Sequence, residues 1–294
     1  MEIKLENDKA SLGLITDVSG STWMLIKKEY FTLFTVLVAV SAVWELGMLF
    51  IFFNYPPLEE TGGQALVAGF LLPFLILGFL YKLAKVKVQG YFFEQFAKSN
   101  GFTYSQDCNL TGRPGSLFQM GHSSKASYEI SGLWKGKQMH IFIFCTTIGY
   151  GKYQQTLFYT VAEVDAGTTC PHVLLAPDTS STKSKILSVA KLKQVPLESA
   201  FEEGLNLYAE KELEQESLQA FPVEILEQIH ERWPNFEIEI VGNKLYIYED
   251  RPITKLDELQ NFFTLSTYMT EKVLPKLSRM STTVTELRTY VNKN

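Results

Sequence analysis

A glycine–lysine pair in the stretch GYGKYQQT, residues 149–156, is the place where the sequence comes nearest to a phosphate-binding loop. Such a loop reads G-x-x-x-x-G-K-[ST] and opens a helix, so that backbone amides at the helix N-terminus surround the phosphates. Here Tyr153 follows Lys152, and the residues from Thr156 alternate as a strand does. Both requirements fail, and the stretch is predicted to be a β-hairpin tip. Tyr150, Lys152 and Tyr153 on this tip are candidate contacts for a partner.

Three further side chains are candidates for catalysis: His122, Cys170 and His172. His122 lies in GHSSK beside serines and a lysine, but the sequence contains no G-x-S-x-G nucleophile elbow. Cys170 stands two residues from His172, as a nucleophile and its base could, although catalytic Cys and His are usually distant in sequence. The sequence favours the competing interpretation of structural histidines and a cysteine packed as a small apolar residue.

Metal, cofactor and nucleic-acid binding have no recognisable signal in the sequence. No two of the four histidines stand at a ligand spacing, and the three cysteines form no C-x-x-C pair. We therefore predict no metal site and no cofactor, and the unpaired cysteines indicate a reducing compartment. The net charge of -5 argues against nucleic acid as a partner, because phosphate binding needs a basic surface. The glutamate-rich run at 198–216 is interpreted as a solvated surface, with a site for a cationic partner as the alternative.

Two apolar stretches precede the part of the chain that holds these residues. Residues 31–53, FTLFTVLVAVSAVWELGMLFIFF, contain one charged side chain and as a helix would cross roughly 30 Å of hydrocarbon. Residues 64–84 are again apolar, and the polar turn at 54–63 joins the two. Because so short a turn joins antiparallel neighbours, the sequence predicts a transmembrane helical hairpin in a lipid bilayer.

The lysines that flank the two stretches predict the orientation of this hairpin. They lie before the first stretch and after the second, whereas the turn carries only glutamates: Lys27, Lys28, Lys82, Lys85 and Lys87 against Glu59 and Glu60. The positive-inside rule then places both termini, residues 1–30 and residues 85–294, in the cytoplasm.

Glu45 lies in the middle of the first predicted span, where an ionised carboxylate costs a few kcal/mol. Three interpretations remain open. A neutral Glu45 could hydrogen-bond to another helix, either in a homo-oligomer or in a different membrane protein. It could instead belong to a proton pathway, or bond within its own helix. The first is favoured, because the second span offers no charged relay partner.

The chain beyond the hairpin has the pattern of an α+β domain with a mainly antiparallel sheet. A short helix at 89–100 ends at Gly101, and strands are predicted at 102–105, 127–134, 139–146, 156–164 and 172–176. The polar loop at 176–185 is a candidate subdomain boundary. Four elements are predicted beyond it: a strand at 205–208, a helix at 222–233, a hairpin at 236–248 that turns at Gly242-Asn243, and a helix capped by Thr254 and interrupted at Pro275.

The run SLQAFPVEILEQIHERWPNFEIEIVGNKLYIY, residues 217–248, resembles a family of bacterial two-span membrane proteins called domain of unknown function 3137. The order of elements from Leu207 to Met269 agrees with that family, as does the G-x-x-x-G-K strand pair of Gly132, Gly136 and Lys137. The similarity is loosest at 107–124. The resemblance implies a cytoplasmic α+β domain anchored in the bacterial inner membrane, and it supplies no catalytic residues.

These observations favour a non-catalytic, membrane-anchored interaction or scaffold module over an enzyme. One alternative is a membrane-bound hydrolase or transferase that uses the loops around His122 and Cys170. Another is an accessory subunit of a transport complex, with Glu45 contacting a further spanning helix.

Overall fold

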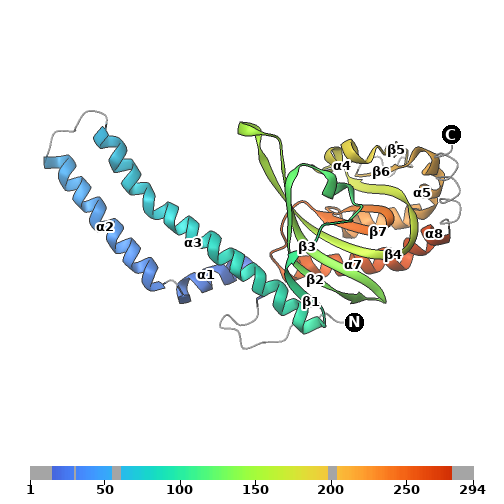
Figure 1. Cartoon of the computed structure of the whole chain (residues 1–294), viewed down its shortest axis with the longest axis horizontal. Helices are drawn as coiled ribbons and strands as arrows, with labels where there is room; N and C mark the ends of the chain where they lie inside the picture. Colours follow the sequence, from blue (N-terminus) through green and yellow to red (C-terminus); the bar gives the residue numbers. More distant parts are fainter. Residues whose placement is uncertain (1–14, 30, 55–60, 198–203, 280–294) are drawn as a thin grey trace. The chain divides into compact units, whose positions relative to one another are not determined.

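The computed structural model describes residues 15–29, 31–54, 61–197 and 204–279 (Figure 1). The chain divides into two compact units, one of residues 6–95 and one of residues 96–294 together with 1–5. The first unit is helical, and the second contains all the described strands. The boundary falls inside the long helix α3.

The helical unit contains α1 (Val18–Glu29), α2 (Phe31–Asn54) and α3 (Thr61–Asn100), of which α3 continues into the second unit. Helix α1 packs antiparallel to the second half of α3. The amide of Ile15 donates to Gln95 Oε1 at 3.2 Å, and the rings of Trp23 and Tyr81 lie 5.2 Å apart. The sequence analysis did not predict α1, although Asp17 accepts a hydrogen bond from the Ser19 amide at 2.8 Å, which is the behaviour of a helix N-cap.

Helix α3 is continuous, so the prediction of one apolar helix at 64–84 and a separate short helix at 89–100 is wrong. Only Gly90 interrupts the helix-forming residues between the two segments, and a single glycine weakens a helix by about 1 kcal/mol without ending it. The predicted end is confirmed. Gly101 has a φ of 73°, and the Phe102 amide donates to the Ala97 carbonyl at 2.9 Å.

Helices α2 and α3 occupy the two stretches predicted to span a membrane. Over the four described ranges, however, no helix is both long enough and apolar enough for a membrane crossing. The spans therefore remain a prediction. Most of the predicted turn, residues 55–60, lies outside the described residues.

The second unit is built on a seven-stranded antiparallel sheet, as the sequence predicts. Its order is β1-β2-β3-β4-β6-β5, and β7 pairs with β4. The strands are β1 (Thr103–Cys108), β2 (His122–Trp134), β3 (Lys137–Ile148), β4 (Gln155–Pro177), β5 (Lys193–Val195), β6 (Leu205–Ala209) and β7 (Glu237–Glu249). Each described pair of strands is antiparallel, and the α+β class is confirmed.

Strands β4 and β7 are each a single strand where the sequence predicted a break. The predicted 236–248 hairpin is wrong, because Gly242 does not turn the chain: it pairs opposite Cys170 with a φ of 61°. Gly-Asn fits a type II′ turn, but the residues on both sides of Gly242 pair with β4, and this pairing keeps β7 extended. The register shifts between Asp165 and Cys170 show that bulges absorb the irregular residues in both strands.

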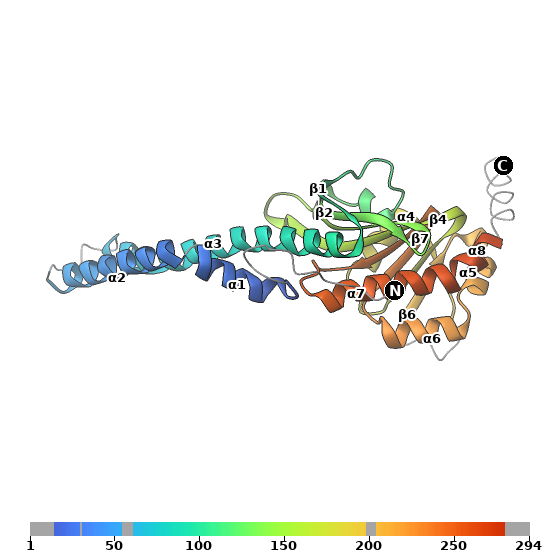
Figure 2. The same cartoon turned by 90° about the horizontal axis from the view of Figure 1, so that it is seen from below.

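The sheet has a different cover on each face. Helices α5 (Glu214–Ala220), α6 (Val223–Arg232), α7 (Leu256–Lys272) and α8 (Leu274–Arg279) lie on one face, below the sheet in Figure 2. The other face is covered by α4 (Lys183–Ala190) and the 3-10 helix η1 (Ser116–Gln119). Side chains alternate accordingly, since Phe142, Phe144 and Tyr246 join the apolar cluster that contains Leu117 and Ile186.

The predicted ends of the C-terminal helices are largely confirmed. Helix α6 starts after Pro222, and Pro275 interrupts the last helix, since α7 ends at Lys272 and α8 begins at Leu274. The cap of α7 was wrongly predicted. Glu258 Oε2 accepts the amides of Thr254 and Lys255 at 2.9 and 3.1 Å, so a glutamate that reaches back replaces the expected threonine.

The ring of Phe263 joins α7 to the sheet, and its removal should destabilise the fold. It lies 4.8 Å from the Trp134 ring and 5.5 Å from the Phe102 ring, and it is 1% exposed. We expect Phe263→Ala to lower the free energy of unfolding by about 3–5 kcal/mol, because a buried aromatic leaves a cavity. Denaturant unfolding of the full chain measures this. The exposed neighbour Thr264→Ala is the control, and an equal effect of both variants would contradict the packing described.

Candidate functional site

The tip between β3 and β4 presents two exposed tyrosines. The last strand pair is Ile148 with Gln155, and the short 3-10 helix η2 (Gly151–Tyr153) closes the loop, so the predicted hairpin tip is confirmed. Tyr150 is 80% exposed and Tyr153 is 77% exposed. Figure 1 shows this tip, in yellow-green, extending beyond the rest of the sheet. The hairpin is therefore an accessible surface.

Side chains from two strands hold the tip in shape. The His122 ring of β2 stacks on Tyr150 with 4.9 Å between centroids and 17° between planes, and His122 Nε2 donates to the Gly149 carbonyl at 3.0 Å. Lys152 Nζ lies 5.1 Å from the centre of the Tyr153 ring. A Cβ at Gly149, whose φ is 72°, would lie 2.5 Å from the Tyr153 carbonyl oxygen. The glycine is thus required by the close approach of the backbone.

The structure assigns His122 a different role from the catalytic one considered from the sequence. Its ring positions Tyr150 and the Gly149 backbone at the tip, a role that sequence reasoning missed. This role of His122 is hard to predict from the sequence, because it depends on the pairing of β2 with β3. That pairing places His122 opposite Thr147, close to the tip, and no local sequence pattern specifies it.

His122 is not brought together with Cys170. His122 pairs with Thr147, which pairs with Thr156 at the start of β4. Cys170 is fourteen residues further along that strand, a path of about 45 Å. Its side chain is 1% exposed, and its thiol donates to the Thr168 carbonyl at 3.5 Å. Cys170 also lies within a strand rather than in a loop.

His172 belongs to a buried hydrogen-bond network centred on the Glu239 carboxylate. Glu239 is fully buried and accepts bonds from His172 Nε2 at 2.7 Å, from Tyr248 OH at 2.6 Å and from Ser116 Oγ at 2.5 Å. The Ser116 amide also donates to both carboxylate oxygens, at 3.1 and 3.0 Å. Burial, followed by the charge of Glu239, holds the pKa of Tyr248 well above its usual value, so the phenol keeps its proton.

The residue types of this network match those of a hydrolase triad, but their order in space does not. In a triad the imidazole lies between the hydroxyl and the carboxylate, and it removes the hydroxyl proton. Here Ser116 and His172 both donate to Glu239, which lies in the middle. The arrangement satisfies a buried carboxylate and fixes η1 to the sheet.

A second charged cluster fixes the 109–115 loop to the same face. Arg113 bonds Glu163, lies 3.0 Å from Glu129, and places its guanidinium 4.5 Å from the centre of the Phe142 ring. Burial, partly offset by Arg113, raises the pKa of the Cys108 thiol to about 12. Burial alone would raise the pKa of Glu129. The hydrogen bond from His140, the charge of His140 and the charge of Arg113 outweigh burial and hold the pKa of Glu129 below its usual value. Cys108 is therefore a poor nucleophile at neutral pH.

A third carboxyl group, Glu237, lies beneath the start of α4. Ser180 Oγ donates to Glu237 and accepts the amides of Thr182 and Lys183 at 3.2 and 2.9 Å. Burial raises the pKa of Glu237 to about 7, and the charge of Asp250 adds to the shift. The protonation state of Glu237 is thus coupled to the hydrogen bonds that begin α4.

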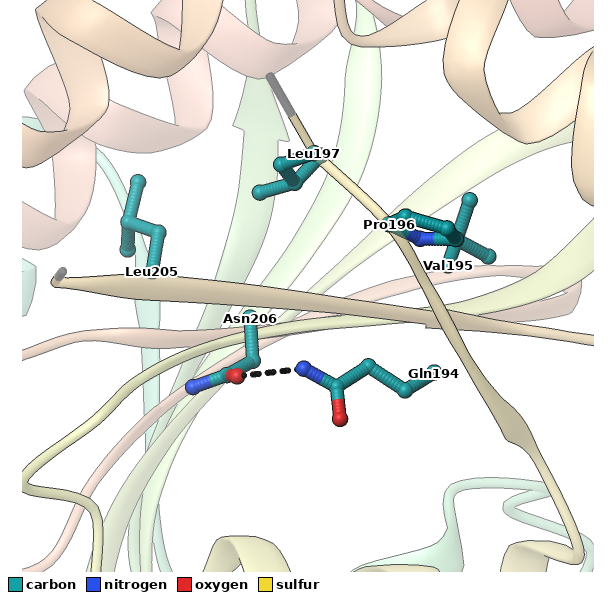
Figure 3. Close-up of a pocket in the computed structure, with 6 residues that line it drawn as sticks. All are labelled: Gln194, Val195, Pro196, Leu197, Leu205 and Asn206. Atoms are coloured by element: carbon teal, nitrogen blue, oxygen red, sulfur yellow. Dashed lines mark hydrogen bonds between the residues drawn. The ribbon is translucent and has the colours of Figure 1, made fainter. Parts of the chain in front are cut away.

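A pocket of about 440 Å³ lies at the β5 edge of the sheet (Figure 3). Leu205 and Asn206 point to opposite sides of β6, and Asn206 Oδ1 accepts a bond from Gln194 Nε2 at 2.9 Å. The remaining lining residues are Val195, Pro196 and Leu197. We assign the pocket no ligand.

The other predicted positions carry no assembled site. Among the residues that the structure describes, no three His, Cys, Asp or Glu side chains are arranged to hold a metal ion. Glu45 lies half-exposed within α2.

Comparison with known proteins gives little further information. No family model matches the chain, so the resemblance to domain of unknown function 3137 stays a prediction, and no curated protein matches either. A crystal structure of the mycobacterial trehalose monomycolate transport factor A, TtfA, aligns with 63% of this chain and 93% of that one, at 13% identity and a TM-score of 0.44. This likeness is too weak to carry an argument about fold or function.

Glu237 should make the stability of the fold depend on pH. The folded state keeps the Glu237 proton up to a pH of about 7, whereas an unfolded chain loses it near 4.5, so the folded state binds more protons between these values. Stability should then fall by about 3 kcal/mol as the pH rises through this window.

The test compares urea unfolding of the wild type and Glu237→Gln at pH values on either side of that window. The Gln side chain cannot ionise, and the variant should lack this part of the pH dependence. The exposed Glu224→Gln should behave as the wild type does. A wild type and Glu237→Gln variant with the same pH dependence would rule out the proposed coupling.

Proposed function

We propose that the chain is a non-catalytic, membrane-anchored binding module of the bacterial inner membrane, with both termini in the cytoplasm. Helices α2 and α3 would form the anchor, and the α+β unit would present the β3–β4 tip to a partner. The observation that carries this proposal is the exposure of large apolar side chains along both helices.

The exposed apolar side chains of α2 and α3 suit a lipid environment better than water. On α2, Val43 is 70% exposed and Leu46 is 67% exposed; on α3, Leu75 is 68% exposed. Other apolar residues at least 47% exposed accompany them: Leu33, Val36, Val38, Val40, Trp44, Leu49, Phe50, Leu71, Phe74, Phe79, Leu83 and Val86. Soluble monomers rarely expose contiguous apolar surface on this scale, because each Å² left in water costs about 25 cal/mol.

Several features support a binding role over catalysis. His172 donates to the buried Glu239, and the His122 ring stacks on Tyr150 and donates to the Gly149 carbonyl, so both imidazoles hold parts of the fold together. The tip, in contrast, offers two exposed aromatic rings, and aromatic side chains are enriched in contact surfaces.

Glu45 would join the anchor to a second spanning helix, in a homo-oligomer or in a different membrane protein. A carboxyl group in hydrocarbon is stabilised when it hydrogen-bonds across a helix interface. An accessory subunit of a transport complex would use the same contact and remains the second candidate.

The anchor predicts that the protein resists extraction from membranes by alkaline carbonate. We expect the double variant Val43→Lys/Leu46→Lys to move into the soluble fraction, because each lysine at the centre of a span costs about 2.5–3.5 kcal/mol of insertion free energy. Leu133→Lys, at a 73% exposed position on β2, is the matched control and should stay with the membranes. Release of the wild type by carbonate would refute the anchor.

The role of Glu45 is tested by crosslinking in intact membranes. Glu45→Leu should lower the yield of the crosslinked species by roughly threefold to tenfold, the effect of losing about 0.6–1.5 kcal/mol of interhelical bonding. Glu45→Gln keeps a hydrogen-bonding side chain and should retain most of the yield. If Glu45→Leu crosslinks as the wild type does, Glu45 makes no such contact.

A further inference from the structure

We propose that the β3–β4 tip binds anionic lipid headgroups, with Tyr150, Tyr153 and Lys152 at the membrane surface. This inference deepens the proposed function and rests on it for the presence of a bilayer. Charge, ring exposure and the rigidity of the turn each support it.

The residues around the tip contain lysines and no carboxylate, although the chain as a whole is acidic. The net charge of the chain is -5, yet Glu129 is the only carboxylate in residues 108–162. Five basic residues lie in the same segment: Arg113, Lys125, Lys135, Lys137 and Lys152. Arg113 and His140 already engage Glu129. Lys135 and Lys137 lie at the opposite end of β3, so the tip side carries Lys125 and Lys152. With no carboxylate between residues 130 and 162, these two lysines suit a surface of opposite sign.

The carboxylates of neighbouring strands lie away from the tip or are paired. Glu163 lies seven residues beyond Thr156 on β4, a distance of about 23 Å along the strand. Glu249 of β7 lies opposite Thr160 and forms an ion pair with Arg251 at 2.6 Å. Lys125, exposed on β2 and paired with Cys145 of β3, adds a second cation on the tip side.

The side chains at the tip are those that suit the boundary between headgroups and acyl chains. Tyrosine has an apolar ring and a polar hydroxyl, and it is enriched at membrane interfaces. Lysine is attracted to an anionic membrane surface. The half-exposed Phe158, opposite Cys145 on β4, extends the apolar surface toward the strands.

The tip is ordered before any ligand binds, which lowers the entropy cost of binding. The His122–Tyr150 stack and the bond from His122 to the Gly149 carbonyl connect the loop to β2. An acidic protein segment would also fit the charge. The bilayer is favoured because the two rings are 80% and 77% exposed on a projecting turn, as side chains that enter a membrane surface need to be.

Trypsin cleavage after Lys152 reports contact of the tip with lipid. The sequence has no other Lys or Arg from 138 to 182, so this cut is unambiguous. The full chain is reconstituted into vesicles of phosphatidylcholine alone or of phosphatidylcholine mixed with phosphatidylglycerol. Cleavage after Lys135, in the turn at the other end of β3, is the internal control. Trypsin reaches only the molecules whose α+β unit lies outside the vesicle, so the rate of cleavage after Lys152 is compared with the rate after Lys135 in the same molecules.

We expect phosphatidylglycerol to slow cleavage after Lys152 by roughly fivefold or more, and added salt to reverse the effect. Tyr150→Ser/Tyr153→Ser and Lys125→Gln keep the cleavage site and should each reduce the protection. Leu133→Ser, exposed at the far end of β2, should leave it unchanged.

Equal cleavage in both kinds of vesicle, or protection that survives the two tyrosine substitutions, would overturn the proposal. Protection that requires an added acidic peptide would assign the tip to a protein partner instead. The anchor and the lipid binding of the tip are tested separately. If the protein is embedded in both kinds of vesicle but is cut after Lys152 at the same rate in each, only the lipid binding of the tip is refuted. If the protein stays in the supernatant with neutral vesicles, yet anionic vesicles protect the bond after Lys152 from trypsin, only the membrane anchor is refuted.

Discussion

The antiparallel pairing of β4 with β7 is the interaction on which the rest of the sheet depends. Strand β4 pairs with β3 over its first half and with β6 over its second, while β7 accompanies it from Thr160 to Leu175. Gly242 in the left-handed region allows both strands to continue through the irregular stretch at Cys170. Without that bulge, the side chains of β7 beyond Gly242 would point to the opposite face of the sheet. The aromatic residues of β7 would then leave the cluster under η1 and α4.

One face of this strand pair buries three carboxyl groups, and each is accommodated by a different physical means. Glu163 is ion-paired with Arg113 and Lys244, Glu239 accepts several hydrogen bonds, and Glu237 holds its proton because its pKa is raised to about 7. Burying a charge is costly unless it is paired, hydrogen-bonded or neutralised. The loops that cover this face, at 109–120 and 178–183, supply several of the required partners.

Local patterns in the sequence were enough to predict most strands, the end of α3 at Gly101 and the hairpin tip at 149–156. They failed where pairing partners lie far apart. The alternation on both sides of Gly242 suggests a hairpin, and only the presence of β4 alongside makes it one strand. The roles of His122, Ser116 and Glu239 depend on contacts between residues 27 to 123 positions apart, which no local pattern encodes.

The network around Glu239 also determines the order in which this domain can be completed on the ribosome. Ser116 and η1 emerge early, whereas Glu239 and Tyr248 follow more than a hundred residues later. Until β7 is synthesised, the segment around Ser116 has no carboxylate to hold it, and one side of β4 has no partner over most of its length. The nascent chain therefore exposes an unpaired central strand to chaperones or to other nascent chains, and the core closes only near the end of synthesis.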